Sequence, residues 1–169
     1  MRDTPGANAQ PDALREQVRT LLTRGKRHEA IQAARELLAG AGGLRTWRFL
    51  AKLAADTSPE QSGLKPLRVA LLSSFSIEFA QDALQAYGLT NGLRIEVYRA
   101  GFGAFRQEIL DPGSGLYAFA PDVVILAVDG ADWVPAAYAD FDARTGAFDA
   151  QVTAFAAEVK ALCEALRAR

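Results

Sequence analysis

The chain has 169 residues, half of them hydrophobic, and a formal net charge of −1 at neutral pH. This length suits one ordinary domain, or a modest domain with an extension. The single cysteine, Cys163, excludes an internal disulfide and a cysteine-based zinc site. No apolar run approaches the ~20 residues of a membrane-spanning helix, and the polar N-terminus does not match a signal peptide. We therefore expect a soluble, cytoplasmic protein without a membrane partner.

The charged residues are distributed unevenly along the chain. Residues 1–68 carry twelve Lys/Arg and seven Asp/Glu, whereas residues 69–169 carry seven and thirteen. This asymmetry predicts two parts of different character, which we place at residues 1–63 and 64–169. The basic residues are scattered along expected helices without interleaved aromatic side chains, so we expect no nucleic-acid partner.

Residues 1–63 predict a disordered start, a helical extension and a linker. The first eleven residues are polar and contain Gly and Pro, which favours disorder. Apolar residues at helical spacing then predict one helix that Asp12 caps and Gly25 ends, followed by helices over 27–39 and 44–55. Residues 56–66 are rich in Ser, Pro and Gly, as linkers are.

Residues 64–169 predict an α/β domain. The apolar runs 68–72 and 122–128 are typical of strands buried on both faces, and 93–98 alternates like a strand. Helices are expected over 77–87, ended by Gly88, over a short stretch up to Leu110, and over 148–166. Right-handed crossovers between such strands give a three-layer, flavodoxin-like parallel sheet with strand order 2-1-3.

Three strands are few for a parallel sheet, and its edges usually need covering. We therefore expect a chain truncated from a longer protein, or a sheet that a partner completes. A partner strand on the exposed edge of the third strand, including one from a second copy, would make the chain an interaction module or a homo-oligomer.

Small hydroxyl residues follow the first strand, where α/β sheets bind their ligands. Ser73, Ser74 and Ser76 could include a nucleophile, but a serine nucleophile needs a base and an orienting acid. The only histidine, His28, lies in the basic helical extension. We therefore give more weight to the alternative that these serines cap the next helix and line a vestigial cleft.

Two further clusters follow the other strands. The loop with Gly101 and Gly103 lacks the third glycine of a dinucleotide-binding loop, so a turn is the favoured interpretation. Aspartates after the third strand could hold Mg²⁺, but helix capping and loop solvation explain them better, and we predict no metal site. They are Asp129, Asp132, Asp140, Asp142 and Asp149. An aromatic rim of a cleft or interface is an alternative role for this region, formed by Trp133, Pro135 and Tyr138.

Three stretches point together to one family. They are Arg68-Val-Ala-Leu-Leu-Ser-Ser-Phe-Ser, the block Arg106-Gln-Glu-Ile-Leu-Asp-Pro with Ser114-Gly-Leu-Tyr, and Pro121-Asp-Val-Val-Ile-Leu-Ala-Val-Asp-Gly-Ala-Asp. The chain resembles the N-terminal domain of FkbH-like proteins, in subfamily IIIC of the haloacid dehalogenase superfamily. In that family this domain is similar to SGNH hydrolases and precedes a Mg²⁺-dependent phosphatase domain. The resemblance implies that the parent enzymes load a glyceryl unit onto an acyl carrier protein in polyketide or related biosynthesis.

The resemblance also implies roles for single residues. Ser74 takes the place of the hydrolase nucleophile, and Gly101 or Gly103 that of the oxyanion-hole glycine. Ala131 stands where the family of hydrolases has its oxyanion asparagine, and losing such a donor typically costs ~10²–10³ in rate. The late Asp-x-x-His block is absent from the sequence, and we identify no phosphatase motif in it.

We therefore predict an accessory domain that is not catalytic by itself and holds no cofactor. Ser73, Ser76, Gly101, Gly103, Asp129 and Asp132 would line its cleft around Ser74. Its partners would be an acyl carrier protein or the phosphatase domain, docked on its charged faces. The alternatives are an active SGNH-type serine esterase or acyltransferase completed by further sequence, and a protein-interaction module.

Overall fold

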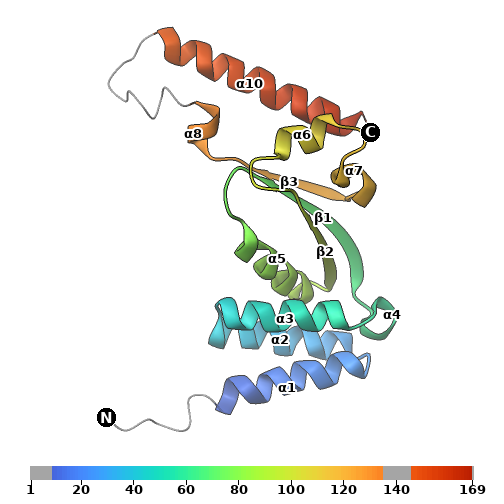
Figure 1. Ribbon diagram of the computed structural model, residues 1–169. Helices are drawn as coiled ribbons and strands as arrows, with labels where there is room; N and C mark the ends of the chain where they lie inside the picture. Colours follow the sequence, from blue (N-terminus) through green and yellow to red (C-terminus); the bar gives the residue numbers. More distant parts are fainter. Residues whose placement is uncertain (1–8, 135–145, 169) are drawn as a thin grey trace, which may run out of the picture. The chain divides into compact units, whose positions relative to one another are not determined.

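The computed structural model describes residues 9–134 and 146–168, and backbone contacts divide the chain into two units (Figure 1). The first unit comprises Met1–Arg68 and Glu78–Val97, and the second comprises Val69–Ile77 and Tyr98–Arg169. The division into residues 1–63 and 64–169 stays a prediction. Within the described ranges, none of the helices has the length and apolar character needed to span a bilayer.

The first unit is a set of helices around one hydrophobic core. Its helices are α1 (Ala9–Thr23), α2 (Arg27–Ala41), α3 (Leu44–Asp56), α4 (Pro59–Ser62) and α5 (Glu78–Thr90). Apolar side chains from one face of each long helix meet in the core, where they are fully buried; they include Val18, Leu22, Leu37, Leu50 and Leu89. The three predicted N-terminal helices are confirmed.

Two expectations for this part of the chain are wrong in detail. Helix α1 begins at Ala9 instead of Asp12, so residues 9–11 are helical and not disordered. Proline is tolerated at Pro11 because the first turn of a helix has no partner for its missing N–H. The expected linker contains α4, which begins at Pro59 and is capped by Ser58, whose Oγ accepts a hydrogen bond from Gln61 N at 3.3 Å.

Helix α5 also differs from the prediction, because it continues past Gly88 to Thr90. Gly88 is buried, and a Cβ atom there would lie 2.7 Å from Cδ1 of Ile95 on β2 (Leu93–Arg99). The glycine therefore permits close packing between helix and strand and does not end the helix.

The sheet has three parallel strands in the order β2-β1-β3, which confirms the predicted order and fold class. Strand β1 covers Lys65–Ser73 and β3 covers Val123–Ala127. The parallel register of β1 and β3 pairs Val69 with Val123 and Ser73 with Ala127. Backbone bonds from Lys65 N to Gly92 O and from Ala100 N to Leu71 O join β1 to the other neighbour.

The second unit adds helices that cover β1 and β3. They are α6 (Phe105–Leu110), α7 (Gly115–Phe119), α8 (Gly130–Trp133) and α10 (Gly146–Arg167), drawn in yellow to red in Figure 1. Their shared core contains Leu72, Phe105, Ile109, Leu116 and Leu162. The predicted C-terminal helix is confirmed as α10. The short helices α7 and α8 were not expected from the sequence.

Strand β3 is less buried than its sequence predicts. Val123 is 42% exposed and Val124 to Ala127 are half-buried, whereas Val69 to Ser73 of β1 are buried. The prediction that both strands are buried on both faces is therefore wrong for β3. The reason is position: β1 has a strand on either side, while β3 is an edge strand of the sheet that the structure describes.

Candidate functional site

The ends of β1 and β3 meet at Ser74, the residue in the predicted nucleophile position. Ser74 Oγ accepts a hydrogen bond from Asp129 N at 2.8 Å, and Ser74 N donates to Ala127 O at 3.1 Å. The side chain is buried, with 9% of the residue exposed. The hydroxyl therefore joins two strand exits. His28, the only histidine of the sequence, is exposed on α2 in the first unit.

The neighbouring serines and glycines bond mainly to one another's backbone. Ser73 Oγ donates to Phe75 O at 2.7 Å, and Ser73 O accepts from Gly103 N at 3.2 Å. Gly103 has φ +67°, a left-handed conformation that favours glycine. Because its N–H already bonds to Ser73, Gly103 does not present a free donor to an oxyanion. Gly101 and Ser76 are exposed.

Among the aspartates after β3 that the structure describes, one caps a helix and two lie within helices. Asp129 Oδ1 accepts from Ala131 N at 2.9 Å and so caps α8. Asp132 is exposed, and Asp149 lies in the first turn of α10, where the helix dipole favours a negative charge. Asp140 and Asp142 lie outside the described residues. In the ranges 9–134 and 146–168, no group of three His, Cys, Asp or Glu residues could hold a metal ion.

Trp133, expected at an aromatic rim, packs within the second unit. Its ring centroid lies 5.7 Å from that of Phe105 and 4.8 Å from that of Phe155 on α10, the latter edge-on. The guanidinium of Arg106 lies 5.2 Å from the Trp133 centroid and 4.6 Å from the Phe105 centroid, within cation–π range. Pro135 and Tyr138, the other expected rim residues, lie outside the described residues.

Arg106 also forms an ion pair that connects α6 to α10. Its Nε and Nη2 both donate to the Glu158 carboxylate, the latter at 3.2 Å. The hydrogen bond from Arg106 lowers the pKa of Glu158, and the same bond raises the pKa of Arg106. No local signal in the sequence points to this pair, because 52 positions separate the two residues.

A second polar cluster involves the block Arg106-Gln-Glu-Ile-Leu-Asp-Pro with Ser114-Gly-Leu-Tyr, one of the three stretches that carry the family resemblance. The Glu108 carboxylate accepts from the Tyr98 hydroxyl at 2.9 Å and from Leu116 N at 3.0 Å, while Ser114 Oγ donates to Glu108 O at 2.6 Å. Burial, with the hydrogen bond to Glu108, raises the pKa of Tyr98 to about 12. A Cβ atom at Gly115 would lie 2.4 Å from the Tyr98 hydroxyl oxygen. The block therefore fixes the connection between α6 and α7.

A cavity of about 450 Å³ opens at the amino end of β3, opposite the strand exits that carry Ser74. Leu116 and Tyr117 of α7, Val124 of β3 and Leu166 of α10 contribute to its lining. The Tyr117 hydroxyl already donates to Ile109 O at 2.6 Å, and Asp122 adds a carboxylate, so the lining is of mixed apolar and polar character.

Together, these features define an α/β protein with a short parallel sheet whose strand exits are bonded internally. No protein-family model matches the chain, and no curated protein matches it. Among solved structures, the chain is similar to one described as the N-terminal part of the protein BF1531 from Bacteroides fragilis, containing a phosphatase domain complexed with Mg. The two share 23% identity with a TM-score of 0.54. The match covers 68% of this chain but spans only 29% of the other, so the likeness concerns the fold.

Proposed function

We propose that this chain is an accessory, non-catalytic module of the FkbH-like type, which works in the cytoplasm by docking an acyl carrier protein or a phosphatase domain. The sequence resemblance suggests the family, and the fold likeness to part of a phosphatase-containing protein agrees with it. The observation that carries the non-catalytic role is the bond from Asp129 N to Ser74 Oγ at 2.8 Å.

The chemistry of acyl transfer explains why this bond matters. A serine nucleophile needs a base within hydrogen-bond reach of its hydroxyl, and N–H donors aimed at the developing oxyanion. Here the hydroxyl oxygen is engaged by a backbone N–H, and the Gly103 N–H is engaged by Ser73 O. These contacts support a structural role for Ser74, in place of a catalytic one. A glyceryl-loading phosphatase partner would bring its own Mg²⁺, and we propose no cofactor for this chain.

Two measurements test the proposal. Titration of the full chain with an acyl carrier protein should show binding in the high micromolar range that weakens as salt is added. Hydrolysis of p-nitrophenyl acetate should be the same for the chain and its Ser74→Ala variant. No carrier binding would contradict the docking role, and esterase activity that depends on Ser74 would favour the alternative of an SGNH-type esterase.

A second candidate is an interaction module that completes its sheet along β3. The exposure of Val123 and the half-buried state of the rest of β3 favour it. Light scattering at increasing protein concentration tests the homo-oligomeric form of this candidate. A monomer at all concentrations would contradict it.

A further inference from the structure

The solvent-facing side of α3 carries three cations, Arg45, Arg48 and Lys52, which we call the cationic row. Their spacing of three and four residues puts them on one helix face, over about 10 Å. All three are exposed. Arg48 Nε lies 3.2 Å from Asp82 Oδ2 on α5. In the part of the chain that the structure describes, Arg45 and Lys52 form no ion pair.

The order of charges along α3 is opposite to the one that stabilises a helix. Arg45 is the second residue, at the positive end of the helix dipole, and the first turn has neither an acidic residue nor a capping side chain. Such a placement opposes the helix by about 0.3–1 kcal/mol. A local arrangement that costs stability without an evident structural return is typical of a functional surface.

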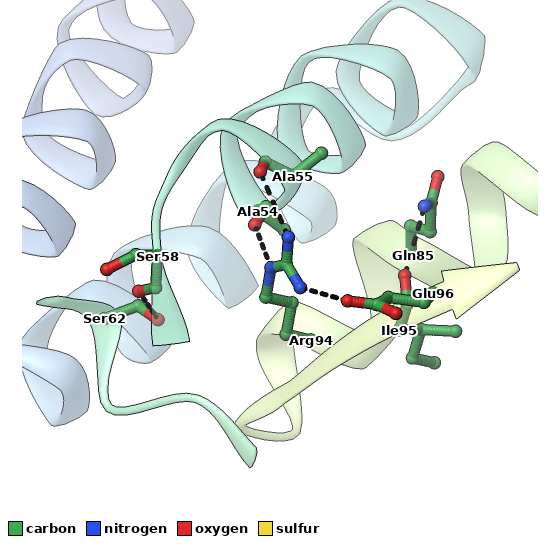
Figure 2. Close-up of polar contacts among 8 residues, drawn as sticks. All are labelled: Ala54, Ala55, Ser58, Ser62, Gln85, Arg94, Ile95 and Glu96. Atoms are coloured by element: carbon green, nitrogen blue, oxygen red, sulfur yellow. Dashed lines mark hydrogen bonds and ion pairs between the residues drawn. The ribbon is translucent and has the colours of Figure 1, made fainter. Parts of the chain in front are cut away.

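At the carboxyl end of α3, in contrast, a cation from β2 lies at the negative end of the helix dipole. Asp56 is the last residue of the helix, at the negative end of the dipole. Figure 2 shows the guanidinium of Arg94 beside this last turn, where it donates to Ala54 O at 3.2 Å and to Ala55 O at 3.4 Å. Arg94 also bonds to Glu96, and the two stand together on β2. The amino end of α3 has no such compensation from a capping side chain.

An exposed aromatic side chain lies close to the cationic row. Phe79 is 58% exposed and stands one turn before Asp82 on the same face of α5, and Asp82 contacts Arg48. Arginine and aromatic side chains are enriched at protein interfaces, where a few of them carry most of the affinity.

We propose that the cationic row and Phe79 form a docking surface for an acidic amphipathic helix of a partner protein. Asp or Glu residues spaced i, i+3 and i+7 on that helix would match the row, and an apolar side chain would contact Phe79. This inference rests on the proposed docking function and assigns it a surface. A phosphate backbone fits less well, because the carboxylates of Asp82 and Asp56 lie along the same face.

Nuclear magnetic resonance of the full chain tests the surface with two probes. One probe is an acyl carrier protein, and the other is a synthetic helical peptide with glutamates at i, i+3 and i+7 and one leucine. We expect both to shift the amide signals of Arg45, Arg48, Lys52 and Phe79, and a peptide with glutamine in place of glutamate to shift none. The double variant Arg45→Glu/Lys52→Glu should weaken binding about tenfold.

The matched control is Arg24→Glu/Lys65→Glu, which reverses two exposed cations elsewhere in the same unit and should leave binding unchanged. Misfolding does not account for a loss in the test variant, because Arg45→Glu places a favourable charge at the helix start. Circular dichroism checks this.

Each outcome decides the question. Equal losses in both double variants, shifts outside the row, or no shift with either probe at millimolar concentration would overturn the assignment. Binding of an RNA oligonucleotide or of anionic vesicles that depends on the row would overturn the choice of partner. If only the peptide binds, at the row, the surface is right and docking of the carrier protein is wrong.

Discussion

The two units differ in where their exposed apolar side chains lie. In the first unit, Leu22, Leu37 and Leu50 are fully buried among the helices. In the second, Val123 of β3 and Val152 of α10 are 42% and 40% exposed. In the first unit the exposed large apolar side chains, Phe79 and Tyr87, both lie on α5, whereas in the second they are spread over several elements, β3 and α10 among them. Their functional surfaces should differ accordingly: the surface proposed on the first unit combines cations with one exposed aromatic side chain, whereas β3 of the second unit offers a strand edge.

Substitution of one apolar residue in each unit, one in a core and one exposed, gives the test with the largest expected effect. Leu50→Ala should lower the free energy of unfolding by about 2–5 kcal/mol, because it leaves a cavity among packed helices. Val152→Ala, on the exposed side of α10, should change it by less than about 0.5 kcal/mol. Urea unfolding followed by circular dichroism measures both. Similar losses for the two variants would mean that α10 is covered in solution, for example by a second copy.

The carboxyl ends of β1 and β3 sharpen the comparison, because the buried hydroxyl of Ser74 forms an internal hydrogen bond there. Ser74→Ala removes the acceptor of the Asp129 N–H and should cost about 1–3 kcal/mol of stability. Ser76→Ala changes an exposed neighbour and should cost less than about 0.5 kcal/mol. If Ser74→Ala leaves the midpoint of urea unfolding unchanged, the hydroxyl is free for another role.

Tyr98 reports on the polar cluster that fixes α6 to α7. Its pKa of about 12 lies above the ordinary value of 10, because burial and Glu108 oppose the phenolate. The unfolded chain therefore loses this proton first, and stability is full below pH ~10 and falls as the pH rises towards 12. The difference in ultraviolet titration between the chain and its Tyr98→Phe variant gives the pKa of this tyrosine. A midpoint near 10 would show that Glu108 and burial have little influence.

The ion pair of Arg106 and Glu158 should have the smallest effect, because its side chains are 41% and 37% exposed. Glu158→Gln should lower stability by about 0.2–1 kcal/mol at pH 7. The lowered pKa of Glu158 means that this contribution is full above about 4.5 and is lost as the pH falls through the folded-state value. Thermal unfolding should therefore separate the two proteins at pH 7, and the difference should shrink as the pH falls through the folded-state pKa of Glu158. A difference that persists in acid would contradict an electrostatic origin.

Much of the fold could be predicted because its signals are local. Apolar spacing located α2, α3 and α10, and the buried runs located β1 and β3 with the correct strand order. Gly88 misled the prediction because a glycine that ends a helix and one that permits contact with Ile95 have the same local sequence. The burial of β3 was overestimated because hydrophobicity does not show whether a strand lies at an edge.

The candidate site was less predictable, because its bonds join distant parts of the chain. Sequence spacing placed Ser74 and Asp129 at strand exits, but the bond between them spans 55 positions and gives the serine a structural task. The contacts of Glu108 with Tyr98, and of Arg106 with Glu158, likewise join separate elements. The predicted lining of a cleft around Ser74 stays a prediction for all six residues, which are Ser73, Ser76, Gly101, Gly103, Asp129 and Asp132.

The hydrogen bonds of Arg94 have a consequence for how the molecule unfolds. The Arg94 side chain of β2 donates hydrogen bonds to the final turn of α3. Ile95, the next residue, packs against Gly88 of α5. Loosening the N-terminal helices therefore removes support from β2 itself. Removing residues 1–63 should accordingly leave a remnant whose sheet frays from its β2 side, with amide protons of Leu93 to Val97 exchanging faster with solvent.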